Sequence, residues 1–424
     1  MKRFCLTGLF IVTTFFVFGQ KVDAIINAKE VERIESKLAS DEMRGRKVFS
    51  PEIDKAADFI AEEFKKAGLE VFEKGKGYKQ DFVMVSAKYL EITATVGETK
   101  VDPVNIIAIT SQPHIKIDQS SGYASQSIKA GDNLFEKAID IVDEGKNTLV
   151  WVDESFAKNF PRLTFFKRNL FKSGKSIVFI LAKEAAQFSI EATHEIKEQK
   201  LANVVGILPG KSKKNEYVIF SGHYDHIGIS SKPLNNDSIY NGANDDAAGI
   251  TAVIMLAKYF KALNNNERTI VFAAFTAEEV GGFGSQYFSK QFDPQKVVAM
   301  FNIELIGTES KWGRNSAYIT GYEKTDMGAI LQKTLEGTGF TFHPDPYPDQ
   351  NLFYRSDNAT LAKLGVPAHT ISTAKMDSEP HYHKVSDEVK TLDMDNMAMI
   401  IKAIALSSKT IVNGKETPTR VGKE

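Results

Sequence analysis

The sequence predicts an α/β fold in which a mixed, mostly parallel sheet is sandwiched by helices and interrupted by an inserted accessory domain. Two observations support this prediction. From Asn203 onward, short apolar runs alternate with segments of helical periodicity, and this alternation is typical of a mainly parallel sheet that is covered on both faces. Between about residues 86 and 202, short apolar runs are instead separated by polar turns, which favours a β-rich insertion.

The first twenty residues differ from the rest of the chain. Lys2 and Arg3 give a short positive start, and Leu6–Gly19 is almost wholly apolar. This pattern is typical of a secretory signal peptide, with cleavage after Gly19. A membrane anchor is the alternative, but the apolar run is shorter than the ~20 residues needed to cross a bilayer. We therefore expect residues 1–19 to be removed on export, a periplasmic or extracellular location, and no stable membrane insertion afterwards.

Composition restricts the site chemistry and the partners. The one cysteine, Cys5, lies inside the predicted signal peptide, so the mature protein would have no thiol or disulfide. Any metal site must then use histidine, aspartate and glutamate. The formal net charge of −1 provides no basic field that would hold nucleic acid. We expect no nucleic-acid partner, and the sequence does not indicate an oligomeric state.

The N-terminal part of the mature chain begins the main domain. Ile53–Ala67 has apolar residues at three- and four-residue spacing, which predicts an amphipathic helix. Ser50 is the expected cap, Pro51 suits the first helical position, and Gly68 ends the helix. We assign residues 20–85 and 203–424 to the main domain. Residues 86–202 form the inserted domain, with expected strands at Asn105–Ile109, Thr148–Val152 and Ser176–Leu181.

After residue 203, four buried strands and two helices are expected. Because ligands of such sheets bind beyond the carboxyl ends of the strands, the residues that follow each strand are of special interest. The expected strands are Tyr217–Ser221, Thr269–Phe275, Val297–Ile303 and Val366–Ile371, and the expected helices are Ile250–Leu263 and Gln286–Phe292.

Acidic residues and histidines cluster at those positions. Taken singly, each cluster has an ordinary interpretation: a loop histidine at the surface, an Asp-Asp pair that caps a helix, or a solvated pair of glutamates. Five such clusters at one edge of one sheet instead indicate a site. The clusters are Gly222–His226, Gly242–Gly249, Thr276–Gly282, Glu304 and Pro380–His383.

The residue types favour a hydrolytic metal centre. Two histidines and three carboxylates, without a thiolate, suit zinc with open positions for water and substrate. One carboxylate can bridge two ions, and a glutamate beside a ligand can take the proton from the attacking water. The pair Glu278–Glu279 supplies one residue for each of the two tasks.

Residues of about 24–85 and 203–412 resemble the co-catalytic zinc aminopeptidase family, an exported bacterial type whose wider relatives include glutamate carboxypeptidases, glutaminyl cyclases and the transferrin receptor. The insertion is similar, in position alone, to a protease-associated domain. Five motifs in the family's order carry the resemblance: His223-Tyr224-Asp225, Asp245-Asp246-Ala247-Ala248-Gly249, Glu278-Glu279-Val280-Gly281, Glu304 and Tyr382-His383.

The resemblance implies a fold of the zinc exopeptidase type and a role for each residue. Asp245 would bridge two zinc ions, with Glu279 and His383 on one ion and His223 and Glu304 on the other. Glu278 would be the general base, and Tyr382 would stabilise the tetrahedral oxyanion. Asp225 would orient the ring of His223. These assignments complete the set of expected site residues: His223, Asp225, Asp245, Glu278, Glu279, Glu304, Tyr382 and His383.

One position departs from the family pattern. The acid after the third strand is normally aspartate, whereas this chain has Glu304. The extra methylene must be absorbed by a bent side chain or a shifted ion. We therefore expect two zinc ions per chain, with the ion at His223 and Glu304 bound more weakly.

The implied function is a zinc metallopeptidase that removes N-terminal residues from peptides. A glutaminyl cyclase-like zinc acyltransferase and a carboxypeptidase of the same family are the alternatives, and a binding protein that has lost catalysis is a third. The presence of all five ligand positions together with Glu278–Glu279 favours hydrolysis. Peptides are the expected partners, and their side-chain preference cannot be read from the sequence.

Overall fold

The computed structural model describes residues 22–72, 77–234 and 236–422, so the predicted signal peptide lies outside the described residues. The chain forms two compact units. Unit 1 comprises residues 1–81 and 202–424, and unit 2 comprises residues 82–201. The insertion predicted from the sequence, residues 86–202, therefore corresponds to unit 2, with bounds that differ by a few residues.

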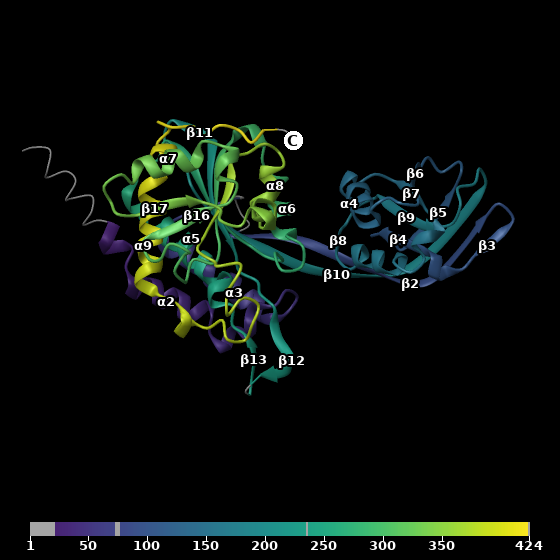
Figure 1. The fold of residues 1–424 in the computed structure, drawn as a ribbon, viewed down its shortest axis with the longest axis horizontal. Coiled ribbons are helices and arrows are strands. Elements are labelled where there is room, and N and C mark those ends of the chain that lie inside the picture. The colour runs from purple at the N-terminus through teal and green to yellow at the C-terminus, as the bar shows by residue number, and fades with distance from the viewer. Residues whose placement is uncertain (1–21, 73–76, 235, 423–424) are drawn as a thin grey trace, which may run out of the picture. The chain divides into compact units, whose positions relative to one another are not determined.

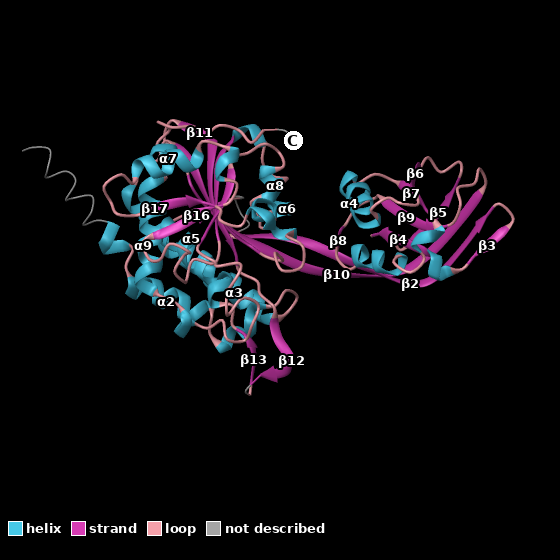
Figure 2. Cartoon of the chain, viewed as in Figure 1, coloured by secondary structure: helices cyan, strands magenta, loops and turns pink. Residues whose placement is uncertain are grey.

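Unit 1 is built on a mixed sheet with helices on both sides (Figures 1 and 2). The strand order is β17-β16-β18-β15-β11-β14-β10-β2-β3, of which β3 and most of β2 and β10 lie in unit 2. The central pairs β14–β11, β11–β15 and β15–β18 are parallel, while β10–β14 and β16–β18 are antiparallel. The main strands are β2 (Lys79–Val96), β10 (Phe188–Leu208), β11 (Lys213–His223), β14 (Arg268–Phe275), β15 (Val297–Ile303), β16 (Ser316–Ile319), β17 (Thr341–Pro344) and β18 (Ala368–Ser372).

The central strands are apolar on both faces because a core lies on each side of the sheet. In β14, Ile270, Phe272 and Ala274 belong to one core, whereas the alternate residues Val271 and Ala273 belong to the other. This alternation is the two-residue period of a strand. The continuous apolar runs in the sequence therefore reflect burial from both sides, and the predicted fold class is confirmed.

The helices form two layers. The helices α2 (Ala28–Leu38), α3 (Pro51–Ala67), α5 (Ala248–Leu263), α7 (Met327–Thr334) and α9 (Met394–Ser407) pack in the larger core. The smaller core contains residues of α6 (Phe283–Ser289) and α8 (Ala359–Ala362). The remaining elements of unit 1 are α10 (Lys409–Val412), β1 (Glu70–Val71) and the hairpin β12 (Gly228–Leu234) and β13 (Asp237–Tyr240).

Ser50 is the N-cap residue of α3, as predicted, although its hydroxyl donates to the carbonyl of Lys47 and makes no cap hydrogen bond to the helix. Two local expectations need correction. The predicted helix Gln286–Phe292 is α6, which begins earlier and ends at Ser289. The strand expected at Val366–Ile371 is β18, which begins after Pro367 because proline has no N–H for the ladder.

Unit 2 contains a four-stranded sheet in the order β4-β9-β7-β6. The expected strands of the insertion correspond to β4, β7 and β9. Val150 and Leu149, neighbours in β7, belong to two different hydrophobic clusters on opposite sides of the sheet. Its elements are β3 (Thr99–Val101), β4 (Ile106–Thr110), β5 (His114–Asp118), β6 (Ala124–Ile128), α4 (Leu134–Glu144), β7 (Thr148–Val152), β8 (Leu170–Phe171) and β9 (Ser176–Leu181).

No helix in the described part of the chain has both the length and the apolar character that a membrane span requires.

Candidate metal centre

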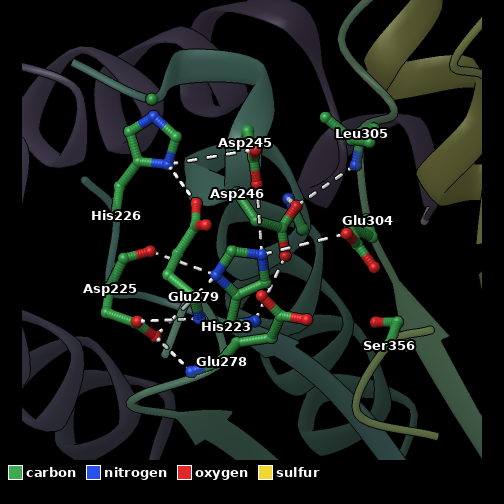
Figure 3. Close-up of polar contacts among 12 residues, drawn as sticks. His223, Asp225, His226, Asp245, Asp246, Glu278, Glu279, Glu304, Leu305 and Ser356 are labelled. Atoms are coloured by element: carbon green, nitrogen blue, oxygen red, sulfur yellow. Dashed lines mark hydrogen bonds and ion pairs between the residues drawn. The ribbon is translucent and has the colours of Figure 1, made fainter. Parts of the chain in front are cut away.

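The predicted site residues meet at the carboxyl ends of the parallel strands of unit 1. His223 is the last residue of β11, Glu278 and Glu279 follow β14, and Glu304 follows β15. Asp245 lies in the turn before α5. Figure 3 shows these side chains pointing toward one another.

The first group of potential ligands consists of His223, Asp245 and Glu304. His223 Nε2 lies 3.2 Å from Asp245 Oδ1 and 3.9 Å from Glu304 Oε1. His223 and Asp245 are buried, and His223 Nε2 has no hydrogen-bond partner among the described residues. Burying a polar atom without a hydrogen-bond partner costs about 1–3 kcal/mol. A metal ion between this nitrogen and the two carboxylates would remove that cost, so the arrangement fits a metal site.

The second group surrounds the other oxygen of Asp245. His383 Nε2 lies 3.2 Å from Asp245 Oδ2 and 3.3 Å from Glu279 Oε2. Zinc bonds of about 2.0–2.2 Å in a tetrahedron place neighbouring ligand atoms about 3.3–3.5 Å apart. The spacings at His383 are close to this value, so these three residues fit a zinc ion without rearrangement.

His226 also lies in the centre, although the sequence analysis gave it no role. Its Nδ1 is 2.7 Å from Glu279 Oε1 and 3.9 Å from Asp245 Oδ2, and its side chain is fully buried. His226, Asp245 and Glu279 together have the spacing of a potential ligand group. The signal in the sequence was its position in the same short loop as His223, directly after a buried strand.

Asp225 acts differently from the expectation. His223 Nδ1 lies 3.1 Å from the backbone carbonyl of Asp225 but 3.9 Å from its carboxylate. The carboxylate instead accepts hydrogen bonds from the backbone N–H groups of Glu278 and Glu279, at 3.0 and 3.3 Å. The carbonyl therefore orients His223, and the carboxylate fixes the loop that carries the glutamate pair.

Two further carboxylates hold the backbone of the site. Asp246 accepts hydrogen bonds from the N–H groups of His223, Gly249 and Leu305, which belong to three separate segments. Asp387 accepts from the N–H groups of Asn244 and Asp245. The peptide bond between Asp245 and Asp246 is cis.

The electrostatics of the cluster favour charge pairs between imidazoles and carboxylates. Burial opposes ionisation of Asp245, but the nearby His223 and His383 outweigh burial and hold the pKa of Asp245 below its usual range. Asp245 and Glu279 together raise the pKa of His383 to about 10. A metal must displace the proton of His383, so metal binding releases protons and weakens as the pH falls.

Glu278 is the glutamate that lies outside both ligand groups. Burial raises the pKa of Glu278 well above its usual range, and the carboxylates of Glu304 and Asp357 raise it further, while His223 lowers it. A carboxyl group with a raised pKa accepts a proton readily, which is the property required of a general base.

Tyr382 lies against the second ligand group. Its ring stacks on that of His383, with centroids 4.0 Å apart. Burial raises the pKa of Tyr382, and the carboxylates of Asp245 and Glu304 raise it further. The phenol therefore stays protonated and can donate a hydrogen bond into the site.

A pocket opens beside the cluster. Its lining includes the apolar side chains of Leu305, Leu352 and Met376 and the ring of Tyr318. Among the hydroxyl groups that line the pocket, those of Thr320, Thr370 and Ser372 each take part in a hydrogen bond within the protein. The remaining lining residues are Asp245, Glu278, Glu304, Arg355, Ser356, Tyr382 and His383.

Comparison with known proteins relates the segment that carries these residues to a protein family. Residues 203–407 match the model of peptidase family M28. This part of the chain belongs to peptidase family M28. The M28 segment contains every predicted ligand, and the predicted enzyme class, a zinc metallopeptidase, is confirmed at the level of the family.

Two fungal proteins are among the relatives of this chain. A probable leucine aminopeptidase of Trichophyton verrucosum (strain HKI 0517) is 31% identical over 46% of this chain and 53% of its own length. A probable zinc metalloprotease of Pyrenophora teres f. teres (strain 0-1) is 34% identical over 52% of this chain and 51% of its own length. The chain thus spans about half the length of these relatives.

A solved structure has a similar fold over nearly the whole chain. The aminopeptidase from Aneurinibacillus sp. strain AM-1 has a TM-score of 0.54 and 18% identity, covering 95% of this chain and 96% of that one. At this identity the likeness concerns the fold. Zinc is the metal that fits both the family and the donor set of carboxylates and imidazoles.

Proposed function

We propose that this chain is an exported aminopeptidase that binds two zinc ions and removes apolar residues from the N-termini of peptides. The observation that carries the proposal is the orientation of Asp245, whose two oxygens face two different histidines at the same distance of 3.2 Å. A carboxylate placed in this way can bridge two ions.

The residues around Asp245 then divide between the ions. His383 and Glu279 would hold one ion, and His223 and Glu304 would hold the other. Zinc, when bound, would polarise the substrate carbonyl and lower the pKa of a water molecule. Glu278 lies outside the ligand groups, so its carboxylate is free to take a proton from that water and pass it to the leaving amine.

Tyr382 would stabilise the charge that develops on the substrate carbonyl. Its protonated phenol lines the pocket beside His383. A hydrogen-bond donor aimed at a developing oxyanion typically contributes about 2.7–4 kcal/mol to the transition state.

The pocket supports N-terminal rather than C-terminal recognition. Its lining includes the carboxylates of Asp245, Glu278 and Glu304 and contains, among the described residues, no buried lysine or arginine that would pair with a substrate carboxylate. The single arginine among its lining residues, Arg355, is exposed and donates a hydrogen bond to Gln350.

The apolar residues that line the pocket suggest that the substrate side chain is apolar. Leu305, Leu352 and Met376 offer no hydrogen bonds, and the neighbouring hydroxyls are already engaged. Burial of a leucine-sized side chain there would contribute about 1.5–3 kcal/mol. The fungal relative named as a probable leucine aminopeptidase supports this choice.

Export is supported by the sequence of residues 1–19 alone, with its positive start and apolar run. N-terminal sequencing of the protein recovered from the periplasm or medium should begin at Gln20. Recovery of a full-length chain in the cytoplasm would contradict export but leave the peptidase proposal intact.

A panel of aminoacyl anilides and peptides, assayed with and without a chelator, tests the activity. Leucyl and methionyl anilides should be cleaved, N-acetylated anilides should not, and chelation should abolish the activity until zinc is added. Full activity in protein shown to contain no metal would overturn the proposal. Release of a C-terminal residue from an N-acetylated peptide would indicate a carboxypeptidase, and pyroglutamate formation from an N-terminal glutamine would indicate a cyclase.

A further inference from the structure

We infer that His226 is a positioning residue for the zinc ligand Glu279, acting through a hydrogen bond from its Nδ1–H. The inference rests on the proposed zinc function and assigns a role to a histidine that the ligand set does not need. Figure 3 shows the His226 ring directed at the Glu279 carboxylate.

The distance between His226 and Glu279 indicates a hydrogen bond between them and not binding of both to one metal ion. His226 Nδ1 and Glu279 Oε1 are 2.7 Å apart. This is shorter than the about 3.3–3.5 Å between two ligands of a tetrahedral zinc, but it matches a charge-assisted N–H···O⁻ bond of about 2.7–2.9 Å. The other glutamate oxygen, Oε2, lies 3.3 Å from His383 Nε2. The two oxygens of Glu279 therefore serve different imidazoles.

The ring of His226 is held rigidly in this position. A Cβ at Gly242 would lie 2.6 Å from the Cγ and Cδ2 atoms of the ring, so the glycine is in close contact with it. The backbone N–H of His226 donates to the backbone carbonyl of Arg46. The guanidinium of Arg46, itself buried, donates to the carbonyls of Tyr224, Asn241 and Gly242. Arg46 thus joins the two loops that flank the His226 ring.

This support has a direct consequence for the metal. With Oε1 engaged by His226, Glu279 presents Oε2 alone to the ion that it shares with His383 and Asp245. A ligand that is already oriented loses less side-chain freedom when the metal binds. Loss of an outer hydrogen bond of this kind typically lowers metal affinity 10–100-fold.

The experiment compares zinc affinity in the full-length protein and two variants by calorimetric titration. His226→Leu removes the donor and should weaken the ion at Glu279 and His383 by 10–100-fold. His226→Asn places an amide N–H near the Nδ1 position and should restore affinity to within a few-fold of the parent. His369→Leu removes another buried histidine, which is hydrogen-bonded to the Thr320 carbonyl and the Thr325 hydroxyl and to none of the proposed ligands, and should leave zinc affinity unchanged.

A second measurement uses the parent protein and does not depend on the folding of the variants. In protein substituted with an NMR-active cadmium isotope, metal–nitrogen coupling should appear for His223 and His383, and His226 should show an uncoupled Nδ1–H. Coupling to His226, or unchanged zinc affinity in His226→Leu, would overturn the inference. Failure of the parent to bind zinc would instead overturn the proposed function.

Discussion

At the scale of single residues, the centre depends on carboxylates whose two oxygens have different partners. Asp245 faces His223 with one oxygen and His383 with the other. Glu279 divides its oxygens between His226 and His383. Each oxygen is therefore fixed in direction. Replacement of Glu279 should weaken mainly the ion proposed at His383, whereas replacement of Asp245 should weaken both proposed ions.

Glu278→Gln should lower turnover by about 10²–10⁴-fold while zinc content stays near that of the parent, because an amide cannot accept the proton. Metal analysis and kinetics on the same preparation provide the measurement. Glu279→Gln is the matched control and should lose zinc. Loss of zinc in Glu278→Gln would show that the roles of the two glutamates are reversed.

Glu304→Asp should tighten the weaker ion by roughly tenfold, equivalent to about 1.4 kcal/mol. The spacing of 3.9 Å between His223 Nε2 and Glu304 Oε1 is wider than the spacings at His383, which fits looser coordination. Calorimetric titration of the metal-free parent should resolve a tight and a weak zinc site. Two equally tight sites in the parent, unchanged by the substitution, would contradict this prediction.

Glu35 provides a pH-dependent prediction away from the metal. It is fully buried in α2, and burial raises its pKa to about 8, while the Thr251 hydroxyl and Arg46 oppose the shift. The folded protein then holds a proton that the unfolded chain releases near pH 4.5. The free energy of unfolding should fall as the pH rises from about 4.5 to about 8, by about 1.4 kcal/mol per unit at most.

Glu35→Gln removes this proton uptake, so the variant should be more stable than the parent at pH 8 by a few kcal/mol and should lose the difference near pH 4.5. Denaturant unfolding at several pH values measures the effect. Glu32→Gln, at an exposed position of the same helix, is the control and should leave the pH dependence unchanged. Parallel stability curves for the parent and Glu35→Gln would show that Glu35 is not protonated in the folded protein.

At the scale of elements, the site is formed by strand ends and one helix start that approach each other closely. Three non-glycine residues with positive φ lie in these turns: Ala277 before Glu278, Leu305 after Glu304, and His383 itself. Such conformations typically cost about 1–3 kcal/mol each and persist where the surrounding structure imposes them. The hydrogen bonds of Asp225 and Asp246 to the backbone hold two of these turns.

Gly249→Ala tests the close packing of α5 on β15. A Cβ at this position would overlap the carbonyl oxygen of Ile303 and the carboxylate of Asp246. We expect the free energy of unfolding to fall by at least about 1–3 kcal/mol. Zinc binding should also weaken, because Asp246 accepts a hydrogen bond from the backbone N–H of His223. Gly174→Ala, where a Cβ meets nothing within 4 Å, should change stability by about 0.5 kcal/mol or less. Equal melting temperatures for the two variants would contradict the packing argument.

The elements also show what could be predicted from the sequence. β14 and β15 were predictable because continuous apolar residues indicate burial on both faces. The small edge strands β16 and β17 were not, since short runs such as Ser316–Ile319 carry little periodicity. The residues proposed as ligands were predicted from the order of their motifs along the chain, and the structure brings them together. The role of Asp225 and the presence of His226 depend on side-chain and carbonyl directions that spacing does not specify.

At the scale of the whole molecule, the two units have separate hydrophobic cores. The proposed metal ligands that the structure brings together all belong to unit 1. Chains with two such cores commonly unfold in more than one step. A ligand that binds one folded unit stabilises that unit, by about 2.7 kcal/mol at a concentration one hundred times its dissociation constant.

The two tryptophans allow each unit to be followed separately, since Trp312 lies in unit 1 and Trp151 lies buried in unit 2. In Trp151→Phe, urea unfolding followed by Trp312 fluorescence should shift to higher urea on addition of zinc. In Trp312→Phe, the transition of Trp151 should not move. Equal shifts in both proteins would show that the two units unfold as one.

The pairing of β2 with β10 has a consequence for how this chain can be altered. The two strands are neighbours in the sheet, and Asn203 donates a hydrogen bond to Gln80 where they leave unit 1. The backbone therefore departs from unit 1 and returns to it at a single place. Because a tight hairpin turn can join two neighbouring antiparallel strands, we expect that the intervening 120 or so residues can be shortened or replaced without a change in the strand order of unit 1.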